Sequence, residues 1–442
     1  MSDLRLERRE IEALPSVRRL AVPEEAMEVA DEIVGDVRAG GLEAVRSHAE
    51  RLGDIEEGEE LFVTAAQLEE SVDEIPEEDE ALLRRACARI EKFARAQRDS
   101  IGEMQVGIPG GRAGHRIAPV EFAGCYAPGG RYPLPSSVLM TAATAKVAGV
   151  EEVWVASPRP EPVTRAAAAI AGAEGLIACG GAQAIAAMAY GTGALPSCDV
   201  LVGPGSKWVT AAKKVLSGTV RIDMLAGPSE LVVLADASAD ASVVAADLLA
   251  QAEHDVDAVP VLVATDPELV ERVEDRLAEQ LESLPTAETA RAALENGFAV
   301  EVDEIEEGIR ACDRLAPEHL EVLTEQPERV GERLEHYGAL FVGSGAAEVF
   351  GDYGAGPNHT LPTGGTARST GGLSVLTFLR VRTWMEINDV NAAGELVEET
   401  AAFARMESLE AHARSAEMRT PPERGPDGEA EEREVEDRED AS

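Results

Sequence analysis

From Ile117 onward, short apolar runs alternate with glycine-rich turns and with segments of helical periodicity. Residues 153–155 and 199–202 are two such apolar runs, and the second leads through Gly203-Pro-Gly205 into a helical segment at residues 207–216. Strands that alternate with helices in this way are typical of a parallel sheet. The alternation therefore predicts an α/β fold.

The alternating pattern occurs twice in tandem. Residues 117–229 form the first predicted unit and residues 230–378 the second, with Gly227-Pro-Ser-Glu230 near their junction. A chain of 442 residues has room for two or three domains. We therefore expect two tandem Rossmann-like parallel-sheet units.

The two ends of the chain differ from this middle part. Residues 1–116 show mainly helical periodicity, clearest at 26–52 and 79–96, and residues 379–415 are also predicted to be helical. Residues 421–442 contain ten acidic and three basic residues and almost nothing apolar. Because such a composition cannot form a core, we expect residues 416–442 to be a disordered acidic tail.

The net charge of −43, from 40 basic and 83 acidic residues, restricts the partners of the chain. An acidic surface repels nucleic acids and anionic membranes. No apolar run approaches the roughly 20 residues of a membrane span, and the N-terminus lacks the apolar segment of a signal peptide. We expect a cytoplasmic protein that binds neither nucleic acid nor membrane.

The acidic excess is spread along most of the chain, which is more than one acidic patch explains. We therefore hypothesise an adaptation to a high-salt cytoplasm, in which screening relieves the repulsion between surface charges. The hypothesis requires a lower melting temperature in dilute buffer than in molar salt. Equal melting temperatures in the two buffers would contradict it.

The polar residues suggest a metal site without sulfur. The five cysteines are scattered and form no C-x-x-C pair, which argues against a zinc–thiolate site. Gln251 and His254 are three residues apart at the end of a predicted helix, so both can face one ion. With Asp352 and His412 they form a ligand set suited to zinc, with room for manganese or cobalt. The alternative is a surface glutamine beside a helix-end histidine.

Glu318 and His319 are adjacent titratable residues that we place at the end of a predicted helix. A histidine beside a carboxylate can accept a proton near neutral pH. The alternative is a solvated acid next to a helix-terminal histidine.

Two further pairs of polar residues occur near the C-terminus. A glycine-containing loop runs from Asp352 to His359 and can present both side chains to one cavity. Glu407 and His412 lie five residues apart on the last predicted helix. They can face one site only if that helix ends or bends between them.

Three predicted strand-to-helix turns carry glycines: Gly129-Gly130, Gly180-Gly181 and Gly203-Pro-Gly205. Such turns expose backbone N–H groups at helix starts, which suits a phosphate group. None of them matches G-x-G-x-x-G, the usual dinucleotide fingerprint. Taken alone, each of these sequences indicates a tight turn more strongly than a phosphate-binding loop.

Taken together, these motifs resemble those of the histidinol dehydrogenase family over residues 20–415. The matching stretches are Tyr126-Ala-Pro-Gly-Gly130, Gly180-Gly-Ala-Gln183, Gly227-Pro-Ser-Glu230, Gln251-Ala-Glu-His254, Pro317-Glu-His319, Gly351-Asp352, Asn358-His359, Gly372-Leu-Ser-Val375, and Glu407 with His412. The resemblance implies oxidation of L-histidinol through L-histidinaldehyde to L-histidine with two NAD in succession, the last step of histidine biosynthesis.

The resemblance also implies roles for individual residues. The implied zinc ligands are Gln251, His254, Asp352 and His412, and the implied proton acceptors are Glu318 and His319. Substrate contacts are implied for the zinc ligands and for Ser229, His319, His359 and Glu407, and NAD contacts for Tyr126 and Gln183. A homodimer with a shared active site is implied as well, in which the segment carrying Glu407 and His412 reaches into the partner.

One position departs from the family pattern. Where the family usually has an asparagine that contacts the cofactor, this chain has Ser206, whose side chain is shorter and has a hydroxyl in place of the amide. We expect a weaker or water-mediated NAD contact at Ser206. At about 1 kcal/mol for an ordinary hydrogen bond, the loss in affinity is several-fold.

Three alternatives remain open at this stage. Ser206 favours a paralogue that oxidises another small polar alcohol. A zinc hydrolase would use Glu318 to activate water and would need no redox cofactor. A non-catalytic metal-binding scaffold would lose nothing measurable on changing His319→Ala.

Overall fold

The computed structural model describes residues 4–14, 22–129 and 132–419 and divides the chain into two compact units. Unit 1 comprises Met1–Ser100 and Pro119–Arg380, and unit 2 comprises Ile101–Ala118 and Val381–Ser442. Gly130 and the predicted acidic tail from residue 420 onward lie outside the described residues. In the described part of the chain, no helix has the length and apolar character needed to cross a membrane.

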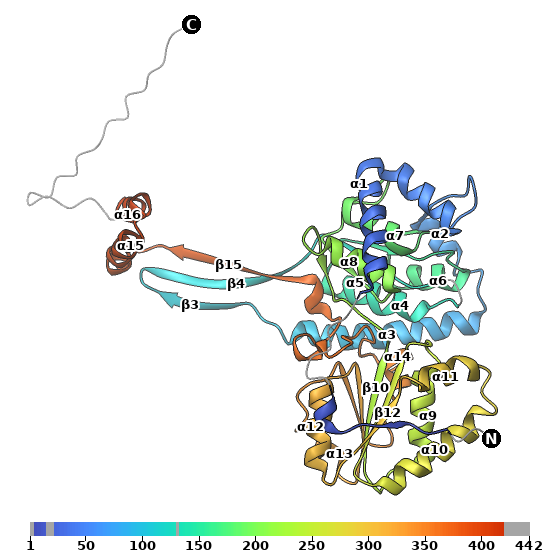
Figure 1. The fold of residues 1–442 in the computed structure, drawn as a ribbon. Helices are drawn as coiled ribbons and strands as arrows, with labels where there is room; N and C mark the ends of the chain where they lie inside the picture. Colours follow the sequence, from blue (N-terminus) through green and yellow to red (C-terminus); the bar gives the residue numbers. More distant parts are fainter. Residues whose placement is uncertain (1–3, 15–21, 130–131, 420–442) are drawn as a thin grey trace, which may run out of the picture. The chain divides into compact units, whose positions relative to one another are not determined.

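The first sheet of unit 1 lies among the helices that Figure 1 labels α1 to α8. It has six strands in the order β2-β7-β6-β5-β8-β9, which are parallel except for β2 against β7. Its strands are β2 (Phe62–Thr64), β5 (Phe122–Tyr126), β6 (Glu152–Ala156), β7 (Gly175–Ile177), β8 (Val200–Val202) and β9 (Arg221–Ile222). Helices α1, α7 and α8 pack together, and α3 packs with α5 and α6. The helices are α1 (Glu24–Leu52), α2 (Ala65–Glu70), α3 (Glu77–Asp99), α4 (Pro135–Val138), η2 (Leu139–Ala143), α5 (Thr144–Ala148), α6 (Pro162–Ile170), α7 (Gly181–Tyr190) and α8 (Lys207–Leu216).

The second sheet of unit 1 is fully parallel, in the order β1-β12-β11-β10-β13-β14. Its strands are β1 (Glu7–Arg8), β10 (Glu230–Ala235), β11 (Val259–Ala264), β12 (Phe298–Glu301), β13 (His319–Leu323) and β14 (Ala339–Val342). One apolar cluster fills the face under α9 (Ala241–Ala252), α10 (Pro267–Leu281) and α11 (Ala287–Leu294). A second cluster fills the face under α12 (Ile305–Leu315) and α13 (Pro327–Gly331), and α14 (Glu348–Tyr353) follows β14.

The helix starts in this half follow from local capping. The side chains of Asp240 and Asp266 accept hydrogen bonds from Ser242 N and Glu268 N, which satisfies backbone donors that the helices leave free. Pro267 occupies the first turn of α10, where its missing N–H costs nothing. Every residue of β10 is buried, as expected for a central parallel strand covered on both faces.

Unit 2 corrects the sequence analysis in two places. The region up to 116, predicted to be mainly helical, contains the hairpin β3 (Met104–Ile108) and β4 (Gly111–Pro119), and β15 (Leu379–Ile387) replaces the helix predicted from 379. The sheet order is β15-β4-β3, and α15 (Gly394–Met406) and α16 (Glu410–Glu417) complete the unit. Residues of β15 such as Val381 and Trp384 favour extended backbone, and Gly110 turns the hairpin at a φ of 74°.

The first strand, β1, is only two residues long and is held in place by one buried carboxylate. The Glu274 side chain of α10 is fully buried and accepts hydrogen bonds from Arg5 Nη1 (2.8 Å), Arg8 Nη1 (2.6 Å) and Leu6 N (2.8 Å). Burial alone would raise the pKa of Glu274. The hydrogen bonds from Arg8, Arg5 and Leu6 outweigh it and lower the pKa below its ordinary value.

We predict that Glu274→Gln weakens the docking of β1 by about 2 kcal/mol, the usual contribution of hydrogen bonds to a charged group. Amide hydrogen exchange around Leu6 should therefore become faster. Because the folded pKa of Glu274 is lowered, its contribution is present at neutral pH and is lost as the pH falls below about 4. Glu271→Gln, an exposed change on the same helix, is the control, and equal exchange in both variants would contradict the prediction.

Candidate active site

The candidate site lies in unit 1 beside a cavity of about 630 Å³. His319, Asp352 and His359 line this cavity from the second half of unit 1, and Phe93 and Gln97 of α3 line it as well. Residues far apart in the sequence thus meet here, and Arg89 of α3 donates a hydrogen bond at 3.3 Å to the carbonyl of Gly354, the residue that follows Tyr353 of α14. The cavity therefore brings together polar groups that the sequence analysis singled out separately.

Glu318 and His319 do not end a helix, as the sequence analysis predicted. Helix α12 ends at Leu315, Ala316 turns the backbone at a φ of 49°, and His319 begins β13. Because β13 pairs with β10, both side chains lie beside the Ser229–Glu230 peptide. Glu230 N donates to Glu318 Oε2 at 3.0 Å, and His319 Nδ1 lies 3.2 Å from Glu230 O.

The surroundings of this pair favour the neutral form of both groups. Burial lowers the pKa of His319 to about 4, although the charge of Asp352 and the hydrogen bond to Glu230 O act in the opposite direction. Burial raises the pKa of Glu318 well above its ordinary value, and hydrogen bonds from Glu230 N and Ser229 reduce that rise. With Nδ1–H donating to Glu230 O, the Nε2 atom of His319 is the one that can accept a proton.

Two of the candidate metal ligands, His254 and Asp352, also come together. His254 Nε2 lies 3.8 Å from Asp352 Oδ2, and one ligand atom each from His254, Glu348 and Asp352 lies within 4.8 Å of the other two. Gln251 is fully buried in the last turn of α9, and His254 lies one residue beyond the end cap of that helix. Asp352 was predicted in a loop, whereas it lies in helix α14.

Several of these polar atoms are buried without a protein partner. Among the described residues, neither Gln251 Oε1 nor Gln251 Nε2 forms a hydrogen bond, and the same holds for both carboxylate oxygens of Glu348. A buried polar group without a partner costs about 1–3 kcal/mol, and more when it is charged. A cation bound among carboxylate, imidazole and amide oxygen donors would remove this cost, so the donor set fits zinc.

The sequence analysis missed Glu348. Its side chain is almost fully buried, and its Oε1 atom lies 3.6 Å from His319 Nδ1. The available signal was its spacing of four residues from Asp352, which places both carboxylates on one face of a helix. The expectation of a loop at Asp352 hid that spacing.

The last pair of candidate residues lies in unit 2. Helix α15 ends at Met406, Ser408 has a φ of 62°, and α16 begins at Glu410. Glu407 and His412 are therefore separated by the helix break that the sequence analysis required, and both are exposed within unit 2.

The residues expected to contact NAD lie at the carboxyl ends of the first sheet. Tyr126 ends β5, and its hydroxyl accepts a hydrogen bond from Gly181 N at 3.3 Å. Gln183 is buried on α7, where its Nε2 donates to Asp54 Oδ2 at 3.0 Å, and its Oε1 has no partner among the described residues. Ser206 is the N-cap residue of α8, but its side chain accepts no capping hydrogen bond. The sequence analysis did not single out Asp54.

A buried ion pair holds the turn that precedes Ser206. Lys213 Nζ lies 2.7 Å from Asp223 Oδ1 and also donates to Gly203 O, while Gly203 N donates to Asp223 Oδ2 at 2.7 Å. Gly203 has a φ of 116°, and a Cβ at this position would collide with the carbonyl of Tyr126. The turn must therefore carry glycine, and its position relative to Tyr126 is fixed.

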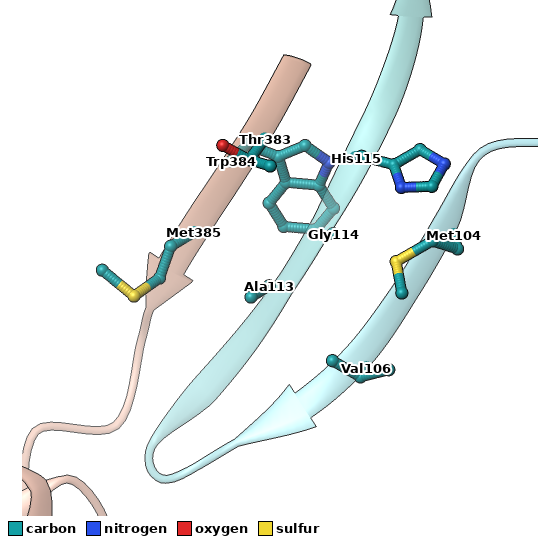
Figure 2. A pocket seen from close by; sticks show the side chains of 8 residues that line it. All are labelled: Met104, Val106, Ala113, Gly114, His115, Thr383, Trp384 and Met385. Carbon is teal, nitrogen blue, oxygen red and sulfur yellow. The ribbon is translucent and has the colours of Figure 1, made fainter. Parts of the chain in front are cut away.

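Unit 2 carries a separate hollow of about 540 Å³ on its three-stranded sheet, shown in Figure 2. It is lined by Met104, Val106, Ala113, Gly114, His115, Thr383, Trp384 and Met385. His115 is the single titratable residue among these, and its Nε2 lies 3.0 Å from Gly102 O. The hollow offers an apolar surface rather than a group of reactive side chains.

Comparisons with known proteins agree with one another. A family model described as histidinol dehydrogenase matches residues 17–420. The histidinol dehydrogenase of Thermus thermophilus is 44% identical over 400 residues, covering 88% of this chain and 95% of that protein. That of Haloarcula marismortui is 42% identical over 393 residues, covering 88% and 92%. The crystal structure of histidinol dehydrogenase from Elizabethkingia anophelis matches with a TM-score of 0.87 at 29% identity, covering 94% of this chain and 98% of that chain.

The chain belongs to the histidinol dehydrogenase family. The family model alone spans most of the sequence, and the structural match extends over both sheets of unit 1. The predicted α/β fold with parallel sheets is thereby confirmed. Membership in the histidinol dehydrogenase family makes the chain an NAD-linked oxidoreductase.

The buried amide of Gln251 generates a test of the metal site in this family member. In the presence of a chelator, Gln251→Met should raise the melting temperature, because it removes a buried amide whose unmet hydrogen bonds cost about 1–3 kcal/mol. With zinc added, the original protein should gain more than the variant, since only the amide can ligate the ion. Gln105→Met on the exposed face of β3 is the control. A lower melting temperature of Gln251→Met in chelator would refute this assignment.

Proposed function

We propose that this chain oxidises L-histidinol through L-histidinaldehyde to L-histidine at a zinc site, using two NAD in succession. The observation that carries the proposal is the buried pair Glu318 and His319 beside the group of His254, Glu348 and Asp352. Such a pair can transfer two different protons while the cavity retains the reactive aldehyde. A biosynthetic role of this kind agrees with the cytoplasmic location expected from the sequence.

The zinc would be held by Gln251, His254 and Asp352 and, in the homodimer proposed below, by His412 of the partner subunit. When bound, it would anchor the imidazole and the amine of the substrate, which requires an open coordination position. Ser229, His359 and Glu407 are proposed as further substrate contacts, and Tyr126, Gln183 and Ser206 as NAD contacts. Ser229 already hydrogen-bonds Glu318, which supports its place beside the reacting groups.

In the first oxidation, His319 Nε2 accepts the hydroxyl proton of L-histidinol while the carbinol hydrogen leaves as hydride to NAD. The neutral imidazole that burial enforces is the form able to accept this proton. In the second oxidation, Glu318 would accept a proton from the water that adds to the aldehyde, and protonated His319 would return a proton to the aldehyde oxygen. The resulting hydrate would lose hydride to a second NAD and its hydroxyl proton to His319. Glu318 has to be ionised for this step, and the hydrogen bonds from Glu230 N and Ser229 favour its ionised form against the effect of burial.

Ser206 favours one alternative, a paralogue that oxidises another small polar alcohol. The alternative predicts that a strain lacking histidinol oxidation still cannot grow without histidine when it expresses this chain, whereas the proposed function predicts that the chain restores growth of that strain. NADH formation from histidinol by the purified protein in high salt would also exclude a zinc hydrolase.

Substitutions of the acid–base pair test the proposed chemistry. We predict that His319→Asn lowers kcat about 10²- to 10⁴-fold, the usual contribution of a general base, with a smaller effect on KM. Glu318→Gln should reduce the NADH formed per histidinol from two toward one and release trappable aldehyde. His336→Asn, a half-buried histidine elsewhere in unit 1, is the control. Unchanged kcat in His319→Asn would rule out its role as the base.

We further propose that the chain acts as a homodimer in which unit 2 completes the site of the partner. Unit 2 buries little beyond Ala401, Ala404 and Ala413, while Met385 and Phe403 remain about two-thirds exposed. A small sheet with so little core is marginal by itself, and exposed apolar surface of this kind marks an interaction face. The hollow over Trp384 in Figure 2 belongs to the same surface.

Mixing two inactive variants tests the shared site. A His319→Asn chain and a His412→Ala chain would each be inactive alone, yet their mixed dimer would contain one intact site. Statistical exchange of subunits should restore about one quarter of the original activity. No recovery after unfolding and refolding the two variants together would show that each chain builds its own site. Separately refolded variants mixed without exchange are the control.

A further inference from the structure

Asp54 places a carboxylate at the N-terminus of α7. It follows the end of α1, where Gly53 turns the backbone at a φ of 76°, and Asp54 N donates to Ala49 O at 2.8 Å. Its Oδ2 atom accepts hydrogen bonds from Gly180 N at 2.9 Å and from Gln183 Nε2 at 3.0 Å. A residue 126 positions earlier in the sequence thus reaches the second glycine-rich turn.

The backbone donors of this turn are consequently already in use. Asp54 accepts from Gly180 N, and the Tyr126 hydroxyl accepts from Gly181 N. In many nucleotide-binding folds these donors would bind a phosphate group. A phosphate here would have to displace a carboxylate of its own charge. The start of α7 is therefore prepared for hydrogen-bond donors and not for an anion.

The strand order shows which part of NAD would lie here. The order β7-β6-β5-β8-β9 corresponds to the order 3-2-1-4-5 of a dinucleotide-binding sheet, in which an acid after the second strand binds the adenosine ribose. In this chain the second strand, β6, is followed by Ser157, Pro158 and Arg159, none of them acidic. The carboxylate is missing from its usual place in the sequence.

Asp54 lies where that carboxylate would be needed. A Cβ on Gly180 would be 2.8 Å from Pro158 Cβ, and one on Gly129 would be 2.7 Å from Pro158 O. The turns after β5, β6 and β7 therefore meet at Pro158, and Asp54 is hydrogen-bonded to one of them. Asp54, in the segment after α1, therefore takes the place of the acid that is missing after β6.

The hydrogen-bond acceptors of Asp54 and Gln183 match the hydroxyl groups of a ribose diol. Gln183 is 1% exposed, and its Oε1 atom has no partner within the described residues. The nearby ion pairs Lys146–Glu174 and Arg165–Glu74 involve other carboxylates, so no described cation neutralises Asp54. Asp54 and Gln183 Oε1 are both acceptors, and ribose hydroxyls are donors. A 2′-phosphate would bring only acceptors and negative charge.

We propose that Asp54 determines the specificity of this chain for NAD over NADP, by accepting hydrogen bonds from the adenosine ribose hydroxyls and repelling a 2′-phosphate. The inference rests on the proposed function, because it concerns the same NAD site. One feature opposes it: Arg159 is exposed directly after Pro158, and an arginine at this place attracts a 2′-phosphate. The experiment decides which of the two charges dominates.

The test measures binding without catalysis. ADP-ribose and 2′-phospho-ADP-ribose are titrated into the full-length protein by calorimetry at one fixed salt concentration. The original protein should bind ADP-ribose more tightly than 2′-phospho-ADP-ribose. Asp54→Asn should reduce the ratio of these two affinities by about tenfold, the effect expected for one nearby like charge. Asp54→Glu keeps the charge and should keep most of the preference.

Asp199→Asn is the matched control, because it also removes one negative charge from this acidic chain. Asp199 Oδ2 also accepts two backbone hydrogen bonds, from Glu121 N and Phe122 N, but at the amino end of β5, away from the nucleotide turns. The affinity ratio should not change in this variant. Melting temperatures of all variants report any loss of folding separately from the ratio.

The remaining outcomes overturn the inference. An unchanged ratio in Asp54→Asn, or tighter binding of 2′-phospho-ADP-ribose by the original protein, would show that Asp54 only anchors α7 or that Arg159 dominates. If neither nucleotide binds while histidinol still yields NADH, this inference fails and the proposed function stands. If neither nucleotide binds and no NADH is formed, both fail.

Discussion

The removal of titratable groups from water beside the amino ends of β10 and β13 is the constraint on which the site depends. Glu318, Glu348 and His319 are all buried, and burial is the largest cause of the pKa shift of each. Both carboxylate oxygens of Glu348 lack a hydrogen-bond partner among the described residues. A fold retains such groups only where function compensates their cost, because an apolar residue of similar size would be more stable.

Strand register turns this constraint into a defined geometry. Pairing of Leu231 with His319 brings the backbone of Glu230 beside the acid–base pair, so that its N–H contacts Glu318 and its C=O contacts His319. Backbone contacts also position residues in the first sheet, where the turn at Gly203 packs against Tyr126 and is held by the ion pair of Lys213 and Asp223. In both sheets, backbone groups at strand ends orient the side chains, which keeps the geometry independent of flexible loops.

The sequence analysis succeeded where the signal is local and failed where it is not. Helix α8 begins and ends as expected, since its apolar periodicity lies within the segment. The strands β3, β4 and β15 were missed, because their sheet is small and exposed and carries a weak apolar pattern. His319 was placed at a helix end, because the turn at Ala316 lacks the glycine that usually marks such a stop.

By itself the sequence determined the α/β class, the two parallel-sheet units and the motifs that identify the family, because these follow from periodicity and short spacing. Only the tertiary structure decided which acids join them. Glu348 of α14 lies 3.6 Å from His319 of β13. Asp54 accepts a hydrogen bond from Gly180, which comes 126 positions later in the sequence. These contacts depend on register and on helix packing against the sheets. Neither leaves a periodic trace in the chain, because each is made by a single side chain at a single point.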